Sequence, residues 1–376
     1  MSKIKLVTVL GTRPEIIRLA EIIKISDQLF DHILVHTGQN YDYSLNEIFF
    51  NELGIRKPDY FLSVAGGHLG ETIGNVIARS YEVFVNERPD ALLVLGDTNS
   101  VLCTIAAKRL KIPIFHMEAG NRCFDQNVPE EINRKISYHI SDINIAYTEH
   151  SRRYLLSEGF KKDNVFVSGS PLREVLNVNA EKINSSTILQ QLGLIKGKYF
   201  VVSAHREENI DLNNNIITIA KSLNGVAEKY QIPIIFSTHP RTKKKIDQEN
   251  IVFNPLIQIL KPFGFFDYVH LQSNSFCVLS DSGTISEESA MMKFPAISIR
   301  TSTERPEAVD AGSIVLGGIN ENEILNSIEL CLATFNKNEQ QIPWEYNIND
   351  VSKRIVRIIQ SYTSIVDRVI WNKLNS

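Results

Sequence analysis

Short apolar runs rich in β-branched residues recur along the chain, and each is followed by polar residues. In the first half these runs cover residues 4–10, 33–36, 91–95, 112–117, 143–147 and 165–167. A continuous apolar run of this length is typical of a strand that is buried on both faces of a parallel sheet. Helical periodicity fills stretches between the runs, for example up to about Gln28 and from Ser44 to Leu53. This alternation predicts an α/β fold with a doubly wound parallel sheet.

A second series of the same kind begins near residue 199. Its predicted strands cover residues 199–203, 232–236, 256–260, 277–279 and 296–299, and each leads into a polar loop. The stretch 172–197 is weakly patterned, so we interpret it as the crossing between two domains. A chain of 376 residues is also long for a single hydrophobic core. We therefore expect one doubly wound domain over 1–171, a second over 172–350 that faces it across a central cleft, and a C-terminal amphipathic helix over 351–376 that packs back on the first.

Composition excludes several classes of function. Apolar residues make up 43% and charged residues 22% of the chain, both ordinary values for a soluble globular protein. The net charge of −3 leaves no basic excess for binding nucleic acid or an anionic membrane. Four cysteines are scattered without the spacing of a metal site, which is typical of reduced thiols in a cytosolic protein. We expect neither a signal peptide nor a membrane span, because no apolar stretch approaches the roughly 20 residues that a span requires.

The stretch 116–134, HMEAGNRCFDQNVPEEINR, concentrates acids and arginines at the end of an apolar run. Glu118 follows that run directly, and Asp97 holds the equivalent place after the preceding predicted strand. Open α/β sheets bind their ligands at the carboxyl ends of their strands, so we expect both acids at one site. Glu130 and Glu131 have a structural alternative, because acids are favoured in the first turn of a helix for capping reasons alone. Asp97 has the alternative of capping the helix that follows it.

The GTRPE loop, residues 11–15, has the form of an anion-binding site. It opens a helix whose N-terminal amides favour an anion, and Arg13 and Arg18 are placed to add bidentate contacts to a phosphate. An ordinary βα turn with two solvated arginines is the alternative. The glycines at 66–70 have the spacing GGxxG, which does not match the dinucleotide fingerprint GxGxxG. The chain also lacks the GxxxxGK[ST] loop of ATPases and GTPases, and it has no metal-type spacing of His, Cys or Asp.

Residues 281–284, Asp-Ser-Gly-Thr, stand at the start of a helix in the second half and form a second candidate anion site. One turn further on, Glu287 or Glu288 is placed to accept hydrogen bonds from ribose hydroxyls, as an acid does in other nucleotide-binding folds. Arg305 is available to the same charges. His205, in another loop of this half, is either a ligand-contacting histidine or a satisfied polar residue of a βα loop. We therefore interpret the second half as a site for a nucleoside diphosphate.

Eight motifs make the chain similar to the non-hydrolysing UDP-N-acetylglucosamine 2-epimerases over about residues 4–360. In order they are GTRPE (11–15), GDTNS (96–100), HMEAGNR (116–122), PEEINR (129–134), SAHREEN (203–209), STHP (237–240), SDSGTISEE (280–288) and TERPEA (303–308). The resemblance implies a GT-B-like architecture of two Rossmann-like domains, a cytoplasmic homodimer and a UDP-sugar substrate. It implies no metal and no nicotinamide cofactor.

The reaction that the resemblance implies inverts C2 of a UDP-N-acetylhexosamine. That carbon is not next to a carbonyl group, so a simple base cannot remove its proton through an enolate. The family instead eliminates UDP from C1 while a base takes the C2 proton, and UDP then adds back to the glycal as a proton reaches the opposite face of C2. Asp97, Glu118 and Glu130 match the family's catalytic acids, and His205 matches its essential histidine. The residues expected to bind UDP are Arg13, Arg18, Phe263, Tyr268, Ser282, Gly283, Thr284, Glu288 and Arg305.

The chain departs from the family pattern at positions that bear on its substrate. Arg18 stands where the family has Lys, which keeps the charge but changes the geometry. The family usually has GQH followed by a basic residue where residues 38–43 of this chain are GQNYDY. In the family this region and the position of Arg206 lie near a second UDP-sugar site that activates the enzyme. Whether this chain is activated in the same way is therefore left open. The loop 121–128 and the KPFGFFDY stretch 261–268 are more similar to the branch that converts UDP-2-acetamido-2,6-dideoxy-L-talose to UDP-N-acetyl-L-fucosamine in capsule and O-antigen biosynthesis.

Three functions are compatible with these observations. The first is C2 epimerisation of a UDP-N-acetylhexosamine. Within it the L-fucosamine branch is preferred over UDP-N-acetylglucosamine and UDP-N-acetylmannosamine, because a Phe- and Tyr-rich loop suits the methyl group of a 6-deoxy sugar. The second is a glycosyltransferase of the same architecture. The third, a nucleotide-sugar-binding regulator without turnover, is disfavoured by the three acids that the chain retains.

Overall fold

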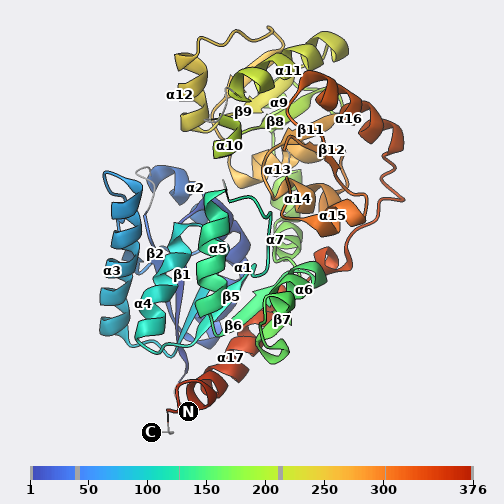
Figure 1. Ribbon diagram of the computed structural model, residues 1–376. Coiled ribbons are helices and arrows are strands. Elements are labelled where there is room, and N and C mark those ends of the chain that lie inside the picture. The colour runs from blue at the N-terminus through green and yellow to red at the C-terminus, as the bar shows by residue number, and fades with distance from the viewer. Residues whose placement is uncertain (1–2, 39–42, 127, 211–214, 301, 374–376) are drawn as a thin grey trace. The chain divides into compact units, whose positions relative to one another are not determined.

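The computed structural model describes residues 3–38, 43–126, 128–210, 215–300 and 302–373 (Figure 1). The chain divides into two compact units: unit 1 is formed by Met1–Val178 with Asn347–Ser376, and unit 2 by Asn179–Tyr346. The sequence analysis placed these divisions at 171/172 and 350/351. Within the described residues, each unit holds one parallel sheet, of seven strands in unit 1 and six in unit 2. The predicted class, an α/β protein with two doubly wound sheets, is confirmed.

The sheet of unit 1 has the strand order β3-β2-β1-β4-β5-β6-β7. Its strands are β1 Lys5–Leu10, β2 Asp31–His36, β3 Tyr60–Phe61, β4 Ala91–Leu95, β5 Ile114–Met117, β6 Ile143–Ala146 and β7 Val165–Val167. The connections from β1 run outward in one direction and those from β4 in the other, so the order reverses between β1 and β4. At such a reversal an open parallel sheet leaves a crevice at its carboxyl ends. The loops that leave β1 and β4 there are GTRPE and GDTNS.

Right-handed crossovers decide which face of the sheet each helix of unit 1 covers. The connections from β1 to β2 and from β4 to β5 run in opposite directions, so α1 and α4 lie on opposite faces. Figure 1 shows α3, α4 and α5 together on one face, whereas α1 packs with α2, α7 and α17. The helices of this unit are α1 Arg13–Leu29, α2 Tyr43–Leu53, α3 Leu69–Glu87, η1 Asn99–Leu102, α4 Cys103–Arg109, α5 Pro129–Ile140, α6 Glu149–Ser157, η2 Lys162–Asn164, α7 Leu172–Val178 and α17 Val351–Val369.

The last helix, α17, completes unit 1 by packing on α1. Its buried residues Ile355, Ile359 and Val366 recur at the spacing of one helical face. Glu174 of α7 binds its N-terminal turn, because the Glu174 carboxylate accepts from the backbone N–H of Ser352 at 2.8 Å and from the Ser352 hydroxyl at 2.6 Å. The end of the chain therefore belongs to the same unit as its first strands.

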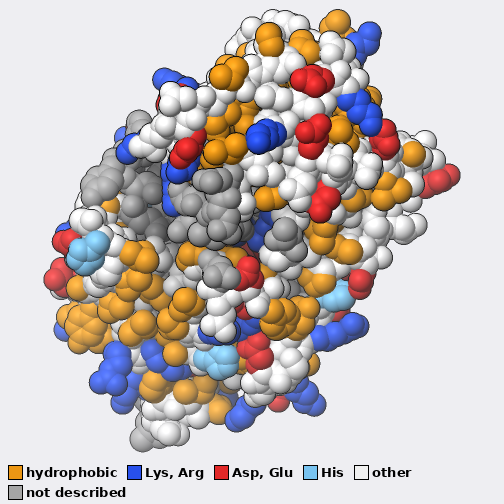
Figure 2. Space-filling model, turned by 45° about the horizontal axis from the view of Figure 1, so that its top comes forward, with side chains coloured by type: hydrophobic (Ala, Val, Ile, Leu, Met, Phe, Trp, Pro, Cys, Tyr) orange, Lys and Arg blue, Asp and Glu red, His pale blue; other side chains and the backbone are white. Residues whose placement is uncertain are grey.

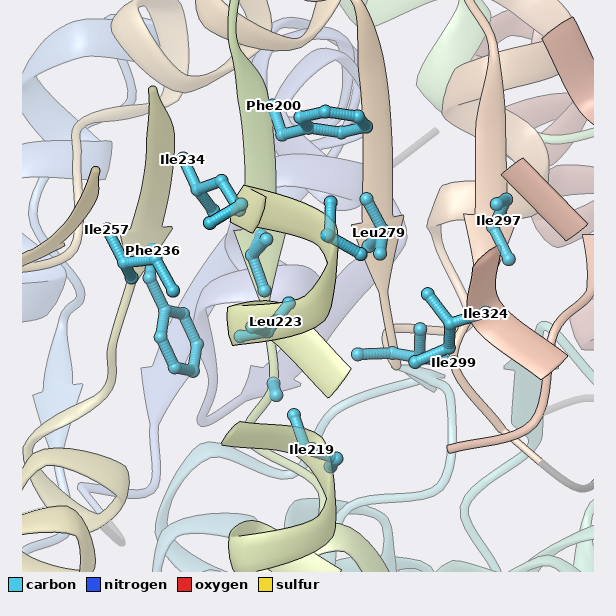
Figure 3. Close-up of a cluster of buried hydrophobic side chains, with 14 of the residues drawn as sticks. Phe200, Ile219, Leu223, Ile234, Phe236, Ile257, Leu279, Ile297, Ile299 and Ile324 are labelled. Carbon is cyan, nitrogen blue, oxygen red and sulfur yellow. The ribbon is translucent and has the colours of Figure 1, made fainter. Parts of the chain in front are cut away.

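Unit 2 repeats the plan with the order β10-β9-β8-β11-β12-β13, which reverses between β8 and β11. Its strands are β8 Phe200–Ser203, β9 Ile234–Ser237, β10 Ile257–Leu260, β11 Cys277–Ser280, β12 Ala296–Ser298 and β13 Val315–Leu316. The core lies between this sheet and two helices, α11 (Asn215–Tyr230) and α16 (Glu321–Thr334). Figure 3 shows Phe236, Leu279, Leu223 and Ile324 among its side chains. The loops that leave β8 and β11 carry His205 and the predicted anion site.

Three short helices in the stretch 172–197 were not predicted from the sequence. The helices of unit 2 are α8 Ala180–Asn184, α9 Ile188–Gln191, α10 Glu207–Ile210, α11 Asn215–Tyr230, α12 Pro240–Gln248, α13 Phe265–Ser273, α14 Ile285–Met292, α15 Pro306–Asp310, α16 Glu321–Thr334 and η3 Trp344–Asn347. The weakly patterned stretch 172–197 holds α7, α8 and α9, which are too short for a helical period to show. None of the described helices combines the length and the apolar composition that a bilayer span needs.

Candidate active site

Asp97 and Glu118 follow neighbouring strands of the unit 1 sheet. Strands β4 and β5 pair in register up to Leu95 and Met117, and the Gly96 N–H donates to the Met117 carbonyl at 3.0 Å. The acids are the residues directly after Gly96 and Met117. A Cβ atom built on Gly96 would lie 3.8 Å from Oε2 of Glu118, so the two loops are in contact. The structure thus places both acids at the carboxyl edge of the sheet, beside the reversal of the strand order.

Glu118 has an unusual backbone conformation for a residue with a side chain, since its φ is +61°. Holding a non-glycine residue in this region costs on the order of 1–3 kcal/mol, and such residues cluster at functional sites. The Tyr138 hydroxyl secures the turn by donating to the Glu118 carbonyl at 3.2 Å. Gly120, with φ at +89°, allows a close approach, because a Cβ there would lie 2.3 Å from the Ser151 carbonyl oxygen. Backbone contacts therefore hold the turn after β5 in one conformation.

The carboxylate of Glu118 is buried against a guanidinium group. Glu118 is 7% exposed and Arg18 of α1 is 4% exposed. Arg18 donates to Oε2 of Glu118, and Asn121 Nδ2 donates to Oε1 at 3.3 Å. Arg18, which the sequence analysis expected at a phosphate, is therefore the partner of a predicted catalytic acid. Arg13 is exposed at the first residue of α1, and its guanidinium carbon lies 5.8 Å from the ring centre of Phe49.

A buried arginine joins Asp97 to α5. Arg134 is 1% exposed, and its Nε and NH2 groups lie 2.8 and 2.7 Å from Oδ2 of Asp97. Its NH1 group donates to Oε2 of Glu131 at 2.8 Å. Burial alone would raise the pKa of Glu131, but hydrogen bonds from Arg134 and from the Cys123 N–H, with the Arg134 charge, outweigh it and hold that pKa below its ordinary value. Arg134 therefore holds Asp97, a predicted catalytic acid, and pairs with the buried Glu131, which was not predicted to be catalytic.

The two acids in the first turn of α5 have different surroundings. Glu131 is 1% exposed and also accepts from the Cys123 N–H at 3.3 Å, so it ties the preceding loop to the helix. Glu130, which matches the family's catalytic acid, is half-buried. The N-cap position belongs to Val128, which makes no side-chain cap. Helix capping therefore does not account for Glu131.

The GTRPE loop binds a carboxylate of its own chain. Glu15 is 2% exposed and accepts from the Gly11 N–H at 2.8 Å and the Thr12 N–H at 2.7 Å. Its other oxygen accepts from the hydroxyls of Thr98, at 3.0 Å, and Ser100 in the loop after β4. Burial raises the pKa of Glu15, although these hydrogen bonds oppose the rise. The Gly11 and Thr12 amides are therefore not available to a phosphate as the sequence suggested, and Glu15 ties together the two loops at the strand reversal.

His116 supports the loop that carries Asp97. It is fully buried, and its Nε2 atom lies 2.6 Å from the Gly96 carbonyl oxygen. Its ring packs edge-on against Tyr138, with 4.8 Å between the ring centres. Burial lowers the pKa of His116 to about 4, so the ring is neutral near pH 7 and Nε2 donates to the Gly96 carbonyl. His116 is therefore a structural residue of the candidate site.

In unit 2, Asp281 organises the loop that carries His205. Asp281 is fully buried, and its Oδ2 atom accepts from the backbone N–H groups of His205 and Arg206 at 2.8 and 2.9 Å. Its Oδ1 atom lies 3.2 Å from Nδ1 of His205. Burial alone would raise the pKa of Asp281, but the charge of His205 and these hydrogen bonds outweigh it and hold that pKa below its ordinary value. Asp281 thus fixes both the backbone and the ring of His205, whose side chain is 35% exposed.

The loop 282–284 contacts a cluster of arginines and one acid. Gly283 is needed there, because a Cβ would lie 2.5 Å from Oε1 of Glu304. Glu304 is 4% exposed and accepts from Arg206 at 2.8 Å and from Arg300 at 2.6 Å. The three residues of the loop are half-buried. Two arginines thus lie close to the loop, and both donate to the carboxylate of Glu304.

The acids and the arginine that follow this loop do not share one role. Arg305 is 2% exposed, and its NH2 group lies 2.8 Å from Oε1 of the fully buried Glu287. Arg305 was expected to be available to the ligand, but the structure holds it in this buried ion pair. Glu288 is half-buried, and Oε2 of its carboxylate accepts from Nε2 of Gln272 at 2.7 Å. Of the two acids considered for ribose binding, Glu288 is thus the more accessible.

The remaining predicted positions are two aromatic residues of unit 2 and the stretch after β2. Phe263 and Tyr268, expected beside the nucleotide, are half-buried, one just before α13 and one within it. The departures from the family pattern at residues 39–42 lie outside the described residues. Among the residues that the structure does describe, no group of three or more His, Cys, Asp or Glu side chains is arranged to hold a metal ion.

Four charged residues that the sequence analysis left unassigned support the predicted ones. Glu15 joins the two loops at the strand reversal, Glu131 and Arg134 hold Asp97 and the loop before α5, and Asp281 orients His205. Each of the four stands inside one of the eight motifs. A charged residue within a motif that already carries a predicted site residue is the signal by which they could have been found.

Comparison with known proteins shows the family of the chain. Residues 24–360 match the protein family described as UDP-N-acetylglucosamine 2-epimerase. The chain belongs to this family. The solved UDP-N-acetylglucosamine 2-epimerase of Rickettsia bellii is 48% identical, with a TM-score of 0.92 over 99% of this chain and 100% of that one. The UDP-GlcNAc 2-epimerase of Methanocaldococcus jannaschii, solved with UDP-GlcNAc and UDP, is 35% identical, with a TM-score of 0.89 over 95% of this chain and 99% of that one.

A further relative of this epimerase carries a different substrate in its name. It is the UDP-2,3-diacetamido-2,3-dideoxy-D-glucuronate 2-epimerase of Pseudomonas aeruginosa, 32% identical over 364 residues, which cover 94% of this chain and 99% of that protein. The resemblance drawn from the eight motifs is thus confirmed at the level of the family, and so is the enzyme class, an isomerase. Membership of the family does not determine the sugar.

Proposed function

We propose that the protein is a UDP-N-acetylhexosamine 2-epimerase that works by elimination and re-addition of UDP. The observation that carries the proposal is the pair of acids Asp97 and Glu118 at one edge of one sheet, each held by a buried arginine. Glu130, in the first turn of α5, is the third acid of the proposed mechanism. In unit 2, the loop 282–284 and Glu288 are proposed to bind UDP.

The proposed chemistry needs proton transfer on both faces of C2. One carboxylate takes the C2 proton as the C1–O bond breaks, and UDP leaves with the bonding electrons to give a glycal. A carboxylic acid then protonates C2 from the opposite face while a UDP oxygen re-forms the bond to C1, so no atom is gained or lost. At least two of the three acids are needed, one as base and one as acid. His205, oriented by Asp281, is proposed to stabilise the departing diphosphate.

For the substrate we propose UDP-2-acetamido-2,6-dideoxy-L-talose, which would yield UDP-N-acetyl-L-fucosamine for a capsule or O-antigen. Support comes from the loop 121–128 and the aromatic stretch 261–268, which suits the methyl group of a 6-deoxy sugar. UDP-N-acetylglucosamine, named in two of the three relatives, is an equally good fit to the family. The relative from Pseudomonas aeruginosa supports the view that members of the family differ in their sugar.

One experiment tests the function and distinguishes the two substrates. The protein is incubated in deuterated water with UDP-N-acetylglucosamine or with the 6-deoxy-L-talose derivative, and proton NMR follows C2. An epimerase replaces the C2 proton by deuterium without any acceptor, whereas a glycosyltransferase or a binding protein leaves it in place. We expect exchange with both, and faster exchange with the 6-deoxy sugar. No exchange with either substrate would refute the proposal, and faster exchange with UDP-N-acetylglucosamine would assign the protein to that branch.

We further propose that the protein is a homodimer formed through the outer face of α3 and α5. Figure 2 shows hydrophobic side chains gathered over this part of unit 1, where Leu69, Tyr81 and Ile132 are 61%, 44% and 54% exposed. Exposed apolar clusters of this kind mark interaction surfaces. Glu82 is exposed on α3 and Lys135 on α5. A two-fold axis that sets α3 of one copy against α5 of the other would pair these opposite charges.

Sedimentation equilibrium tests this dimer. The wild-type protein is expected at about twice the chain mass of 42.6 kDa. The variants Tyr81→Arg and Ile132→Arg are expected at the single-chain mass, because each would bury a charge in an apolar contact. Val252→Arg, at a position of unit 2 that is 83% exposed, is the control and should leave the dimer intact. A wild-type monomer, or a dimer that both variants leave unchanged, would exclude this surface.

We also place the protein in the cytoplasm. Its four cysteines are free in the structure, and two of them, Cys103 and Cys277, are fully buried. Free thiols are the usual state of cysteine in a reducing compartment.

A further inference from the structure

Gln272 is a buried polar residue of unit 2 whose side chain donates a hydrogen bond to Glu288. It lies in the last turn of α13 and is fully buried. Nε2 of its amide donates to Oε2 of Glu288 in α14 at 2.7 Å. Oε1 of the same amide is buried and has no hydrogen-bond partner among the described residues. An unpaired buried oxygen costs roughly 1–3 kcal/mol, so an apolar side chain of similar volume would suit the packing better.

The structure treats the two neighbouring acids of α14 differently. Glu287 is fully buried and pairs with the Arg305 guanidinium at 2.8 Å, so a cation cancels its charge. Glu288 is half-buried, and its contact with Gln272 is to a neutral amide. This hydrogen bond from a buried amide restricts the direction of the Glu288 carboxylate. Glu288 also stands one helical turn after the loop 282–284.

We propose that Gln272 is a positioning residue that orients the Glu288 carboxylate toward the ribose hydroxyls of bound UDP. The inference rests on the proposed function, because it takes UDP to bind at the loop 282–284. A glutamate side chain loses up to about 2 kcal/mol of conformational freedom when it is ordered. A hydrogen bond from a buried amide removes part of that cost before the ligand arrives. Hydroxyl groups are donors that an acceptor-only carboxylate binds well.

Calorimetric titration with UDP and with 2′,3′-dideoxyuridine diphosphate distinguishes positioning from support of the fold. In Gln272→Met the affinity for UDP should fall about tenfold, as expected for a weakened hydrogen bond to a charged group. The affinity for the dideoxy nucleotide should stay within about twofold, because it lacks the hydroxyls. In the exchange assay, KM for the UDP-sugar should rise by more than kcat falls. The control is Gln258→Met on the exposed side of β10, which should change neither affinity.

Each outcome of this experiment decides the inference. Equal losses for both nucleotides, or no loss for either, would overturn it. If Gln272→Met does not fold, Glu288→Gln carries the test: it should lose the discrimination between the two nucleotides, and retained discrimination would overturn the inference. If both fold, the double variant should lose no more than Glu288→Gln alone. A wild-type protein that binds no UDP would overturn the proposed function as well, whereas normal C2 exchange with unchanged discrimination in Gln272→Met would overturn the role of Gln272 alone.

Discussion

Glu118→Gln is expected to abolish exchange of the substrate's C2 proton while UDP still binds. Glutamine keeps the size of the side chain and can accept a hydrogen bond from Arg18, but it cannot take or give a proton. Removal of one acid–base group lowers a rate by about 10²–10⁴-fold. The loop 282–284 and Glu288 belong to unit 2, so the affinity for UDP should change by less than about threefold.

Proton NMR in deuterated water measures this effect, with Glu149→Gln as the matched control. Glu149 pairs with Arg152 on α6, and their side chains are 32% and 36% exposed. An exposed pair of this kind contributes at most about 1 kcal/mol, so the control should fold and exchange normally. Circular dichroism during thermal unfolding shows whether Glu118→Gln is folded, and titration with UDP measures its affinity for the nucleotide. Exchange at the wild-type rate in Glu118→Gln would remove Glu118 from the mechanism and leave Asp97 and Glu130 as the acid and base.

The fold was predictable because its strands are continuous apolar runs. The predicted runs 91–95 and 165–167 coincide with β4 and β7, and the other predicted strands end within two residues of the observed ones. A strand buried on both faces produces this strong pattern. The edge strands β3 and β13 were not predicted, since each has only two residues and a partner on one side. Helices as short as α8 and α9 contain too few residues for a period to be recognised.

The positions of the candidate site were predictable, but the partners of its residues were not. The rule that ligands bind at the carboxyl ends of strands brought Asp97 and Glu118 together from the order of two strands alone. Nothing in the sequence showed that Glu118 would meet Arg18, 100 residues away, or that Asp97 would meet Arg134. The guanidinium group of an arginine binds a phosphate or a carboxylate equally well, so the sequence does not show which of the two a given arginine contacts. The tertiary structure shows the partner.

Buried acids explain the other difference between sequence and structure. Glu15 accepts from the backbone N–H groups of the GTRPE loop, and Asp281 does the same in the loop that begins at His205. Both loops satisfy amide groups with a carboxylate of their own chain. A glycine- and proline-containing loop at a helix start therefore identified a place that binds a negative charge, but not whether that charge comes from a ligand or from the protein.

Arg134→Met is expected to have the largest effect on stability. It takes from Glu131, which is 1% exposed, the guanidinium that lies 2.8 Å away and leaves the longer contact with Arg122 at 3.9 Å. It also removes two contacts from Asp97. Removing one partner of a buried ion pair costs roughly 3–5 kcal/mol, which lowers the midpoint of thermal unfolding by about 10 °C for a unit of this size. The exchange reaction should be lost too, because Asp97 is no longer held in place. Arg152→Met, which breaks the exposed pair with Glu149, is the control and should cost at most about 1 kcal/mol.

The pH dependence and a double variant identify the cause of this loss. The pKa of Glu131 in the folded protein lies below its ordinary value of 4.5, so its ion pair stabilises the protein above pH 4.5 and is lost as the pH falls through the folded pKa. The difference in the free energy of unfolding between wild type and Arg134→Met, measured with urea, should be full near pH 7 and shrink below about pH 4. Adding Glu131→Met removes the buried carboxylate that has lost its nearer cation and should recover most of the stability. It should not recover C2 exchange, because Asp97 still lacks Arg134. A double variant as unstable as the single one would show that lost packing, and not the weakened ion pairing of Glu131, destabilises Arg134→Met.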